Sequence, residues 1–503
     1  MPIDPSKTIA SRLERVYAGP LGPLALLAIS VPFGVWWFFS QMRGSSSTPV
    51  SFDAMAACFV ILAMAYLGLH GLRNMAWTSL PVLLTFEALA GFVAVPAWQF
   101  ATGADTLDSS YELAMFLVLI AFAAFWLGSA VLMKEKGLRF SPSIGYTSGR
   151  VLIASVVMLV LGGLGKFVLW KFGLFGYGGD DQSRGSYSGI LAWLTFMSDL
   201  LGYALVVSAI EVLGKRSPER AIKVVFWLSF LPSIGFGIIS GMKSDMLTPI
   251  FDVILIYGVT RRQLPRITVI IPVVLILVIY PFTNAFRENL NVGYRAQFNT
   301  LGGMKETLVK SFDDAFFSFG AASQGATSES FRQASNRVSY LTYVRDVSSL
   351  PNPSMLQTDE KIWMAPLYAL VPRFLWKSKP IMSKGGILSV LVGRPGSTSS
   401  AVTPIGDLYS ANGTWGVAIG MLIWGLFVQL SMNWIGSKPA SERMLFAYLL
   451  MLRPLLDMEN DFTTMIAAAV QMAIMAVVIS YAIYGRSPFI PRDARGEGAF
   501  VIQ

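Results

Sequence analysis

The composition of this 503-residue chain excludes most classes of soluble protein. Apolar residues make up 54% of the chain and charged residues 14%, and the mean hydropathy is +0.57, whereas soluble domains are about one quarter charged. Cys58 is the single cysteine and His70 the single histidine, which argues against a disulfide, a zinc site and a Ser-His triad. The net charge of +9 would suggest nucleic acid in a soluble protein, but membrane topology explains it more simply. The composition therefore predicts an all-α polytopic membrane protein.

The chain contains twelve apolar runs of roughly 20 residues, the length of a helix that crosses a bilayer. Their limits are 21–40, 54–72, 79–100, 112–133, 151–175, 189–213, 224–242, 245–260, 268–286, 411–436, 444–462 and 463–485. The sequence thus predicts about twelve transmembrane helices in a single membrane domain over residues 1–503. Residues 287–410, between the ninth and tenth runs, are too polar to span and are predicted to form an insertion outside the bilayer.

Basic residues predict the orientation of the helices, because cytoplasmic loops carry an excess of Lys and Arg. With the N-terminus inside, the inner segments hold twenty basic residues, whereas the short outer loops and the outer half of the fifth run hold five. These five are Arg43, Lys166, Lys171, Arg184 and Lys243. Both termini are therefore predicted to be cytoplasmic, and the 287–410 insertion is predicted to lie on the outer face.

The 287–410 insertion carries thirteen Lys and Arg against nine Asp and Glu. The preference of Lys and Arg for cytoplasmic loops does not explain this excess of basic residues on the outer face, although long loops translocate largely regardless of charge. The excess is explained if the insertion binds an anion, and a solvated loop surface is the alternative.

Two arginines of the insertion lie in a predicted amphipathic helix. Residues 328–347 carry an apolar stripe at steps of three and four that ends in Arg345, and Arg337 lies about 80° away at ~100° per residue. An arginine on an apolar face indicates a buried anion or a carboxylate partner. The alternative is a side chain that snorkels to water from a helix on the membrane surface.

A basic stretch follows an apolar helical run that is predicted to stop before Pro372, because proline disfavours helix for the residue before it. Aromatic residues lie among its four cations, which are Arg373, Lys377, Lys379 and Lys384. Such a mixture at a membrane interface suits the diphosphate of a lipid-linked substrate, with Arg as a bidentate fork and Lys as a point charge. An ordinary interfacial anchor of Trp and Lys is the alternative.

Residues 393–416 are rich in Gly, Ser and Thr and run into the tenth apolar span. Irregular backbone near a membrane is tolerated where it lines a protein or water cavity. Asp407 is the only carboxylate of this stretch, with Tyr409 two residues on, and an acid that faces a cavity is a candidate general base for a hydroxyl nucleophile. An N-cap or turn aspartate for the following helix is the alternative.

Three segments carry a family resemblance: PRFLWKSKP at 372–380, TPIGDLYSANGTWGVAIGMLIWGLF at 403–427 and SGMKSDML at 240–247. They resemble the O-antigen polymerase family, the Wzy-type oligosaccharide repeat-unit polymerases, which also have one large outer loop before the last helices. Two positions depart from the family's pattern, because Lys243 stands where Arg is more usual and Asp407 where Glu is common. Both keep the charge, but lysine does not bind phosphate as a planar fork.

The resemblance implies a C-type membrane glycosyltransferase, a polysaccharide polymerase on the periplasmic side of a bacterial inner membrane. It would transfer a growing glycan from undecaprenyl diphosphate onto a hydroxyl of the next lipid-linked repeat unit, without cofactor or metal and with a chain-length regulator as a candidate partner protein. A diphosphate leaving group needs cations where negative charge develops, and the acceptor hydroxyl needs a base. Arg373 is the expected catalytic cation and Asp407 the expected base. The expected substrate-binding residues are Lys379, Lys243, Arg345, Arg337 and Tyr409.

Two other functions remain alternatives. Glu87 and Asp199 lie inside predicted spans, where a central charge costs roughly 2.5–3.5 kcal/mol and indicates a functional site. They favour a lipid-linked glycan flippase or a proton-coupled transporter, although transporters are often built from two related halves and the halves of this chain are unlike. An O-antigen ligase is the second alternative, for which the expected histidine base is hard to place because His70 lies at the inner end of its predicted span.

Overall fold

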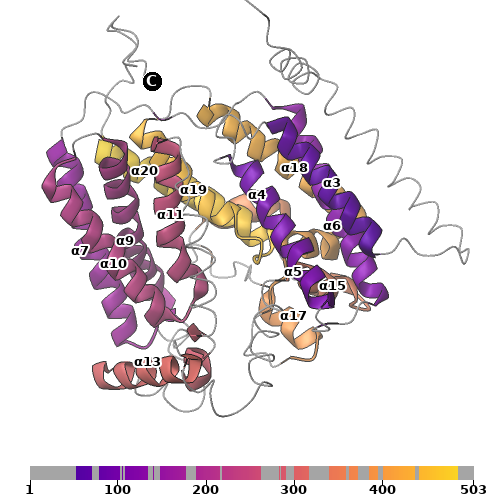
Figure 1. Ribbon diagram of the computed structural model, residues 1–503, viewed down its shortest axis with the longest axis horizontal. Helices are drawn as coiled ribbons and strands as arrows, with labels where there is room; N and C mark the ends of the chain where they lie inside the picture. Colours follow the sequence, from indigo (N-terminus) through magenta and orange to yellow (C-terminus); the bar gives the residue numbers. More distant parts are fainter. Residues whose placement is uncertain are drawn as a thin grey trace, which may run out of the picture. The chain divides into compact units, whose positions relative to one another are not determined.

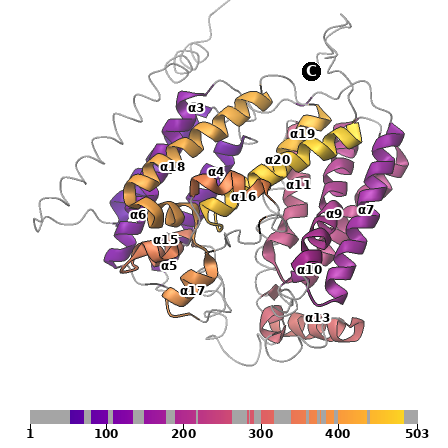
Figure 2. The same ribbon diagram turned by 180° about the vertical axis from the view of Figure 1, so that it is seen from behind.

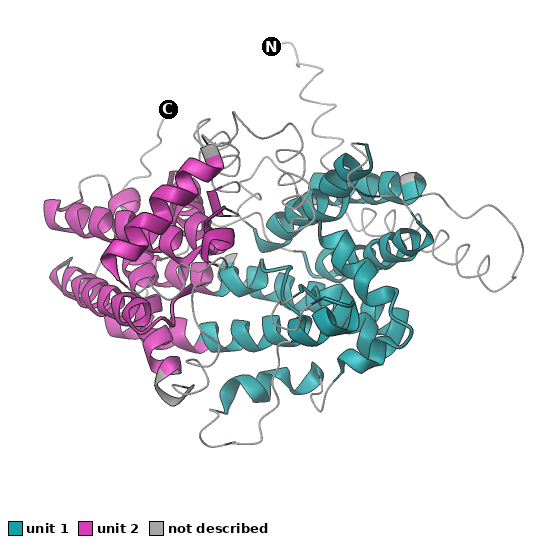
Figure 3. Cartoon of the chain, turned by 90° about the horizontal axis from the view of Figure 1, so that it is seen from below, with its two compact units in different colours: residues 1–138, 335–438, 451–473 teal, residues 139–334, 439–450, 474–503 magenta. Residues whose placement is uncertain are grey.

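The computed structural model describes residues 52–70, 79–101, 105, 108–133, 140, 148–176, 188–215, 218–261, 282–283, 285–290, 300–316, 339–357, 362–371, 376, 384–394, 400–436 and 441–484. Over these ranges the fold is helical and contains no strand. The chain divides into two compact units (Figure 3), of which unit 1 comprises residues 1–138, 335–438 and 451–473 and unit 2 comprises residues 139–334, 439–450 and 474–503. The 287–410 insertion therefore contributes to both units, whereas the sequence predicted it as one segment of a single domain.

Ten of the twelve predicted spans fall on observed helices. The first, 21–40, lies outside the described residues, as does most of 268–286. Seven helical stretches of the described part are long and apolar enough to cross a membrane: Leu80–Ala101, Ser109–Val131, Gly149–Lys171, Trp193–Gly214, Arg220–Ser240, Pro404–Asn433 and Phe462–Tyr484. This is the architecture of a helical membrane protein, and the number of twelve spans stays a prediction.

The helix at the predicted span 444–462 is shorter than expected. Helix α19 (Glu442–Leu455) has 14 residues, which cover about 21 Å at 1.5 Å per residue, less than the ~30 Å of a hydrocarbon core. Pro454 lies in its last turn, where a proline ring opposes continuation of the helix. A turn then leads into α20 (Phe462–Tyr484).

Unit 1 is built on a group of apolar helices (Figure 1). They are α3 (Phe52–His70), α4 (Leu80–Ala88), the π-helix η3 (Leu89–Ala94), α5 (Val95–Ala101), α6 (Ser109–Val131), α18 (Pro404–Gly436) and the first part of α20. A chain of hydrogen bonds crosses them, from Tyr66 to Ser129 at 2.6 Å and from Ser129 to Gln429 at 2.9 Å. These three polar side chains of apolar helices thus satisfy one another, as the absence of water in hydrocarbon favours.

Apart from the end of α19, the remaining described elements of unit 1 come from the 287–410 insertion and are called the loop helices here. They are α15 (Tyr340–Ser348), the 3₁₀ helices η7 (Pro353–Leu356) and η8 (Ile362–Met364), α16 (Ala365–Leu370) and α17 (Gly385–Leu391). As predicted, the apolar run before Pro372 ends its helix at Leu370. The predicted stripe over 328–347 is helical from Tyr340 onward, with Leu341 and Val344 buried, and its first part lies outside the described residues.

Unit 2 contains four antiparallel apolar helices and one that crosses their ends (Figures 1 and 2). The four are α7 (Ser148–Lys171), α9 (Ser188–Gly214), α10 (Arg220–Ser240) and α11 (Lys243–Arg261). The crossing helix is α13 (Leu301–Phe316). It packs through Met304, Leu308 and Ala315 on a core that includes Leu169 and Trp170 at the end of α7.

Glycine permits the close approach of α7 and α9. A Cβ atom added at Gly162 would lie 2.2 Å from the backbone nitrogen of Leu201, and one at Gly165 would lie 2.7 Å from that of Ser198, whereas one at the neighbouring Gly163 would have nothing within 4 Å. Small residues at such crossings allow the van der Waals contact that holds membrane helices together.

We expect Gly162→Ala to destabilise unit 2 and Gly163→Ala to leave it unchanged or slightly more stable. Both substitutions raise the helix propensity by the same amount, about 1 kcal/mol. The difference between the stabilities of the two variants therefore measures the clash with Leu201, and such overpacking typically costs about 1–3 kcal/mol. Thermal unfolding of the purified protein in detergent measures the difference. Equal melting temperatures for the two variants would contradict the close approach.

Candidate functional site

The loop helices are held together by a small apolar core. Val347 of α15, Leu356 of η7, Leu388 of α17 and Val402, which precedes α18, form its buried centre, and Tyr409 packs against it. Burial of such side chains contributes roughly 1.5–3 kcal/mol each. Segments that are far apart in the insertion are thus brought to the N-terminal end of α18.

A buried ion pair lies beside this core. Lys384, the residue before α17, places Nζ 2.5 Å from Oδ1 of Asp407 in the first turn of α18, and both side chains are 0% exposed. Removing one partner of a buried pair typically costs about 3–5 kcal/mol, because the other charge is left uncompensated. This pair therefore fixes the position of α17 on α18.

Further hydrogen bonds satisfy both members of the pair. Gln357, just after η7, accepts from Lys384 Nζ at 3.2 Å and donates to Asp407 Oδ1 at 3.1 Å. The same amide donates to Ser410 Oγ at 2.6 Å. A buried charge pair is tolerated when its remaining donors and acceptors are occupied, and Gln357 performs this role for both charges.

The backbone before Asp407 is strained. Thr403 has a φ of 60° and is the one residue other than glycine with a positive φ among the described residues, a conformation that is uncommon for β-branched residues. Its hydroxyl accepts from Gly406 N at 3.1 Å and its carbonyl from Asp407 N at 3.0 Å. The Gly/Ser/Thr-rich stretch therefore becomes helical at Pro404, so that Asp407 lies in a helix, with non-helical backbone only at Asn412–Gly413.

Asp407 also binds the start of α20. Its Oδ2 accepts from the backbone nitrogen and from the hydroxyl of Thr463, both at 3.0 Å. Asp461, which precedes α20, accepts from Thr464 N at 2.7 Å. The predicted alternative, in which Asp407 caps the helix that follows it, is wrong, because Asp407 lies inside α18 and caps the distant α20. Two carboxylates therefore interact with the positive end of the α20 dipole.

The environment of Asp461 favours its protonated form. Burial, followed by the negative charge of Asp407, raises the pKa of Asp461 from an ordinary 3.8 to about 6, and the hydrogen bonds from Thr464 and the charge of Lys384 oppose the shift. The Asp461 carboxyl is therefore the group of this site that changes charge near neutral pH.

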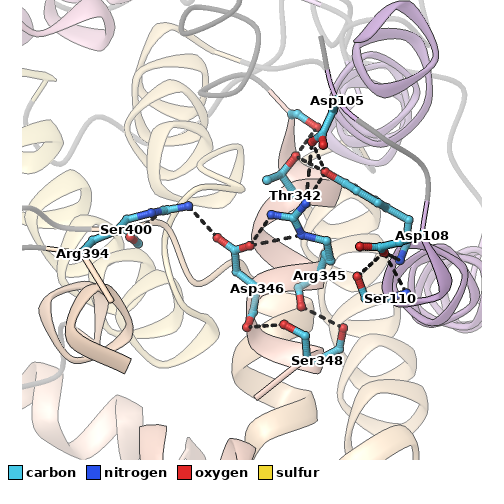
Figure 4. Close-up of polar contacts among 12 residues, drawn as sticks. Asp105, Asp108, Ser110, Thr342, Arg345, Asp346, Ser348, Arg394 and Ser400 are labelled. Carbon is cyan, nitrogen blue, oxygen red and sulfur yellow. Dashed lines mark hydrogen bonds and ion pairs between the residues drawn. The ribbon is translucent and has the colours of Figure 1, made fainter. Parts of the chain in front are cut away.

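Arg345 has carboxylate partners, which was one of its two predicted explanations (Figure 4). Its Nη2 lies 2.8 Å from Oδ1 of Asp346. Its Nη1 donates to the hydroxyl of Tyr111 at 2.8 Å and lies 3.7 Å from Oδ2 of Asp105. Arg394 binds the other oxygen of Asp346 at 2.9 Å. The side chains of Arg345 and Arg394 are 22% and 44% exposed, and the carboxylates between them offset much of the positive charge that an anion would meet.

The end of α16 is fastened to α20. Gln471 Nε2 donates to the carbonyl oxygen of Ala369 at 3.1 Å, which satisfies one of the carbonyls that a helix leaves open at its C-terminal end. Trp376 packs on Tyr368 with 5.6 Å between the ring centroids. The described residues on both sides of the basic stretch are therefore bound within unit 1.

The structure describes only some of the predicted site residues. Asp407, Arg345 and Tyr409 are described, and Asp407 and Tyr409 belong to the same end of unit 1, with Tyr409 partly buried against the apolar core. Arg373, Lys379 and Arg337 lie outside the described residues, as does the side chain of Lys243, whose backbone begins α11. The roles of these residues in substrate binding stay predictions.

Sequence reasoning missed the residues that surround Asp407. Lys384 was counted with the basic stretch, but no local pattern indicated its pairing with Asp407, and Gln357 and Thr463 gave no signal. Asp461 could have been found as an acid directly before an apolar helix. Over the described ranges no group of three or more His, Cys, Asp or Glu side chains could hold a metal ion, and the expectation of a metal-free site stays a prediction.

Comparison with known proteins yields one family. The family described as a domain of unknown function (DUF8712) matches residues 187–450, which is more than half of the chain. No curated protein and no solved structure matches the chain. The matched range includes Gln357, Lys384 and Asp407 but ends before α20.

The buried pair can be tested by a double-mutant cycle. We expect Lys384→Met and Asp407→Asn each to lower the stability of the purified protein by about 3–5 kcal/mol, because each leaves one buried group without its partner. The double variant should lose less than the sum of the two, by about 1–3 kcal/mol of coupling. Denaturant or thermal unfolding in detergent gives the four values, and strictly additive losses would show that the two side chains do not interact.

The Asp461 carboxyl predicts a pH dependence of stability. Because its pKa is raised to about 6 in the folded protein, the folded state holds the proton more tightly than the unfolded chain, and stability falls as the pH rises from about 4 to about 6. We expect Asp461→Asn to remove this loss, so that above pH 7 the variant is about 2–3 kcal/mol more stable. Melting curves at pH 4.5 and 7.5 measure it, with Glu306→Gln, at an exposed carboxylate of α13, as the control that should behave as the wild type.

Proposed function

We propose that this chain, which belongs to the family described as a domain of unknown function (DUF8712), is a membrane glycosyltransferase that polymerises lipid-linked oligosaccharides. It transfers a growing glycan from undecaprenyl diphosphate to a hydroxyl of the next lipid-linked repeat unit, on the periplasmic face of a bacterial inner membrane. The resemblance of its motifs to the O-antigen polymerases supports this reaction, and the arrangement of the loop helices supports where it takes place.

The observation that carries the proposal is the attachment of the basic stretch at both of its ends. Before the stretch, the carbonyl of Ala369 accepts from Gln471 of α20. At its end, Lys384 binds Asp407, which in turn binds Thr463 of α20. Gln471 lies eight residues beyond Thr463, about 12 Å further along the helix at 1.5 Å per residue. Ala369 and Lys384, on either side of residues 372–383, are thus both held to the same membrane-length helix.

This location suits the diphosphate of a lipid substrate. Arg373 follows Ala369 by four residues, and Lys379 precedes Lys384 by five, so that the cations of the stretch lie in the sequence between two attachment points on α20. Cations that are held in place before the reaction stabilise the charge that develops on a leaving diphosphate.

In this proposal the first role of Asp407 is to position Lys384. Both of its carboxylate oxygens already accept hydrogen bonds, so that as a general base it would have to exchange Lys384 for the acceptor hydroxyl.

We expect Arg373→Ala and Asp407→Asn to abolish glycan polymerisation while the protein still inserts into the membrane. Removal of a cation or a base at the reacting atoms typically lowers the rate by 10²-fold or more. Each variant replaces the wild-type copy in the cells, and the glycans are separated on a gel, with protein abundance in the membrane measured in parallel.

The matched control is Lys305→Ala, which removes an exposed lysine of α13 and should leave the ladder of chain lengths intact. A full ladder from cells with Arg373→Ala or Asp407→Asn would overturn the assigned site. Glycosyltransferase genes and a flippase gene encoded beside this one would support the polymerase.

One observation favours the transporter alternative. Glu87 lies in α4, two residues before Leu89, where the π-helix η3 begins, and its Oε1 accepts from the hydroxyl of Tyr340 at 3.0 Å. Acids inside membrane helices and π-helical turns are both frequent at functional sites. If the chain is a proton-coupled flippase, purified protein in vesicles moves lipid-linked glycan across the bilayer without lengthening it, and Glu87→Gln stops the movement.

A further inference from the structure

Helix α13 of unit 2 has three distinct faces. Its inward face consists of Gly303, Thr307, Ser311 and Ala315, all buried. At about 100° per residue, Glu306 and Asp313 lie together on a second, exposed and charged face. The third face is apolar yet exposed: Leu301 is 70% exposed, Val309 52% and Phe312 48%.

The apolar face flanks the surface through which α13 packs on the protein. Around the helix, the face that contacts the protein is followed by the exposed apolar face and then by the exposed charged face. A helix at a membrane boundary has this order, because its apolar face meets acyl chains while its charged face meets water. Lys305 lies within the apolar face and is exposed, and its long side chain can extend to headgroups while its stem stays in an apolar environment.

The neighbouring helix ends have the side chains of a membrane interface. Helix α13 packs at the end of α7, which exposes Phe167 and Phe172 and has Lys171 in its last turn. The adjacent α9, antiparallel to α7, exposes Trp193 to 69% near its beginning. Aromatic and lysine side chains collect where hydrocarbon meets water, and α13 crosses the bundle at this level (Figure 1).

We infer that α13 is an interfacial helix, whose Leu301, Val309 and Phe312 enter the lipid surface of the leaflet next to the end of α7. The exposed aromatic side chains at the adjoining ends of α7 and α9 are typical of a lipid boundary, which is why the occupant is lipid and not a second protein. The inference does not depend on the proposed glycosyltransferase reaction.

Site-directed spin labelling tests the inference directly. The chain has one cysteine, Cys58, so that Cys58→Ser provides a background for single labels. Val309→Cys and Phe312→Cys place a nitroxide on the apolar face, and Glu306→Cys and Asp313→Cys place it on the charged face of the same helix as matched controls. The full-length protein is reconstituted in vesicles of phosphatidylethanolamine and phosphatidylglycerol, and collision of each label with oxygen and with a water-soluble nickel chelate is measured.

We expect labels at 309 and 312 to collide with oxygen several-fold more often than with the nickel chelate, and labels at 306 and 313 to show the reverse. Ready access of the nickel chelate at 309 and 312 would place this face in water and overturn the inference. Low access of both reagents at these positions would show that protein covers the face, either another segment or a second copy, and would overturn it as well.

Discussion

The buried ion pair between Lys384 and Asp407 is the contact on which the arrangement of unit 1 depends. It joins α17 to α18, and through Thr463 it reaches the first turn of α20. Neither side chain reaches solvent, so that each charge is stable only while the other is present. Gln357 bonds to both members, which connects η7 to the same point. Four elements from separate parts of the sequence thus meet at one pair of charges.

The same rule, that a polar group away from water needs a partner, explains other contacts of unit 1. Tyr66, Ser129 and Gln429 satisfy one another across three apolar helices. The Gln471 amide donates a hydrogen bond to the carbonyl oxygen of Ala369. This contact does more than add stability, because it attaches the end of α16 to the membrane-length helix α20. Polar residues in the apolar spans therefore serve to position the insertion.

The two units use the insertion differently. In unit 1 its loop helices bind α20 through Ala369 and, by way of Asp407, through Lys384, and we propose a lipid diphosphate at the basic stretch between them. In unit 2 its helix α13 exposes an apolar face beside exposed aromatic residues of α7, where we propose contact with the lipid leaflet. Strain at Thr403 is tolerated because the surrounding contacts hold the turn that presents Asp407. Both proposals follow from one property of the insertion, which is that cationic and apolar side chains occur together in a segment outside the spans.

The sequence by itself determined the helical membrane architecture, the limits of most helices and the end of α16 before Pro372, because the length of an apolar run and the effect of proline are local properties. For Arg345 it left two possibilities open, an anionic or carboxylate partner and a side chain that snorkels to water. Only the tertiary structure decided that Lys384 binds Asp407, 23 residues away, that Asp407 caps α20, 56 residues away, and that α13 keeps an exposed apolar flank. The physical reason is that such contacts depend on how helices pack, and neither hydropathy nor helical spacing specifies which side chains a crossing brings within bonding distance.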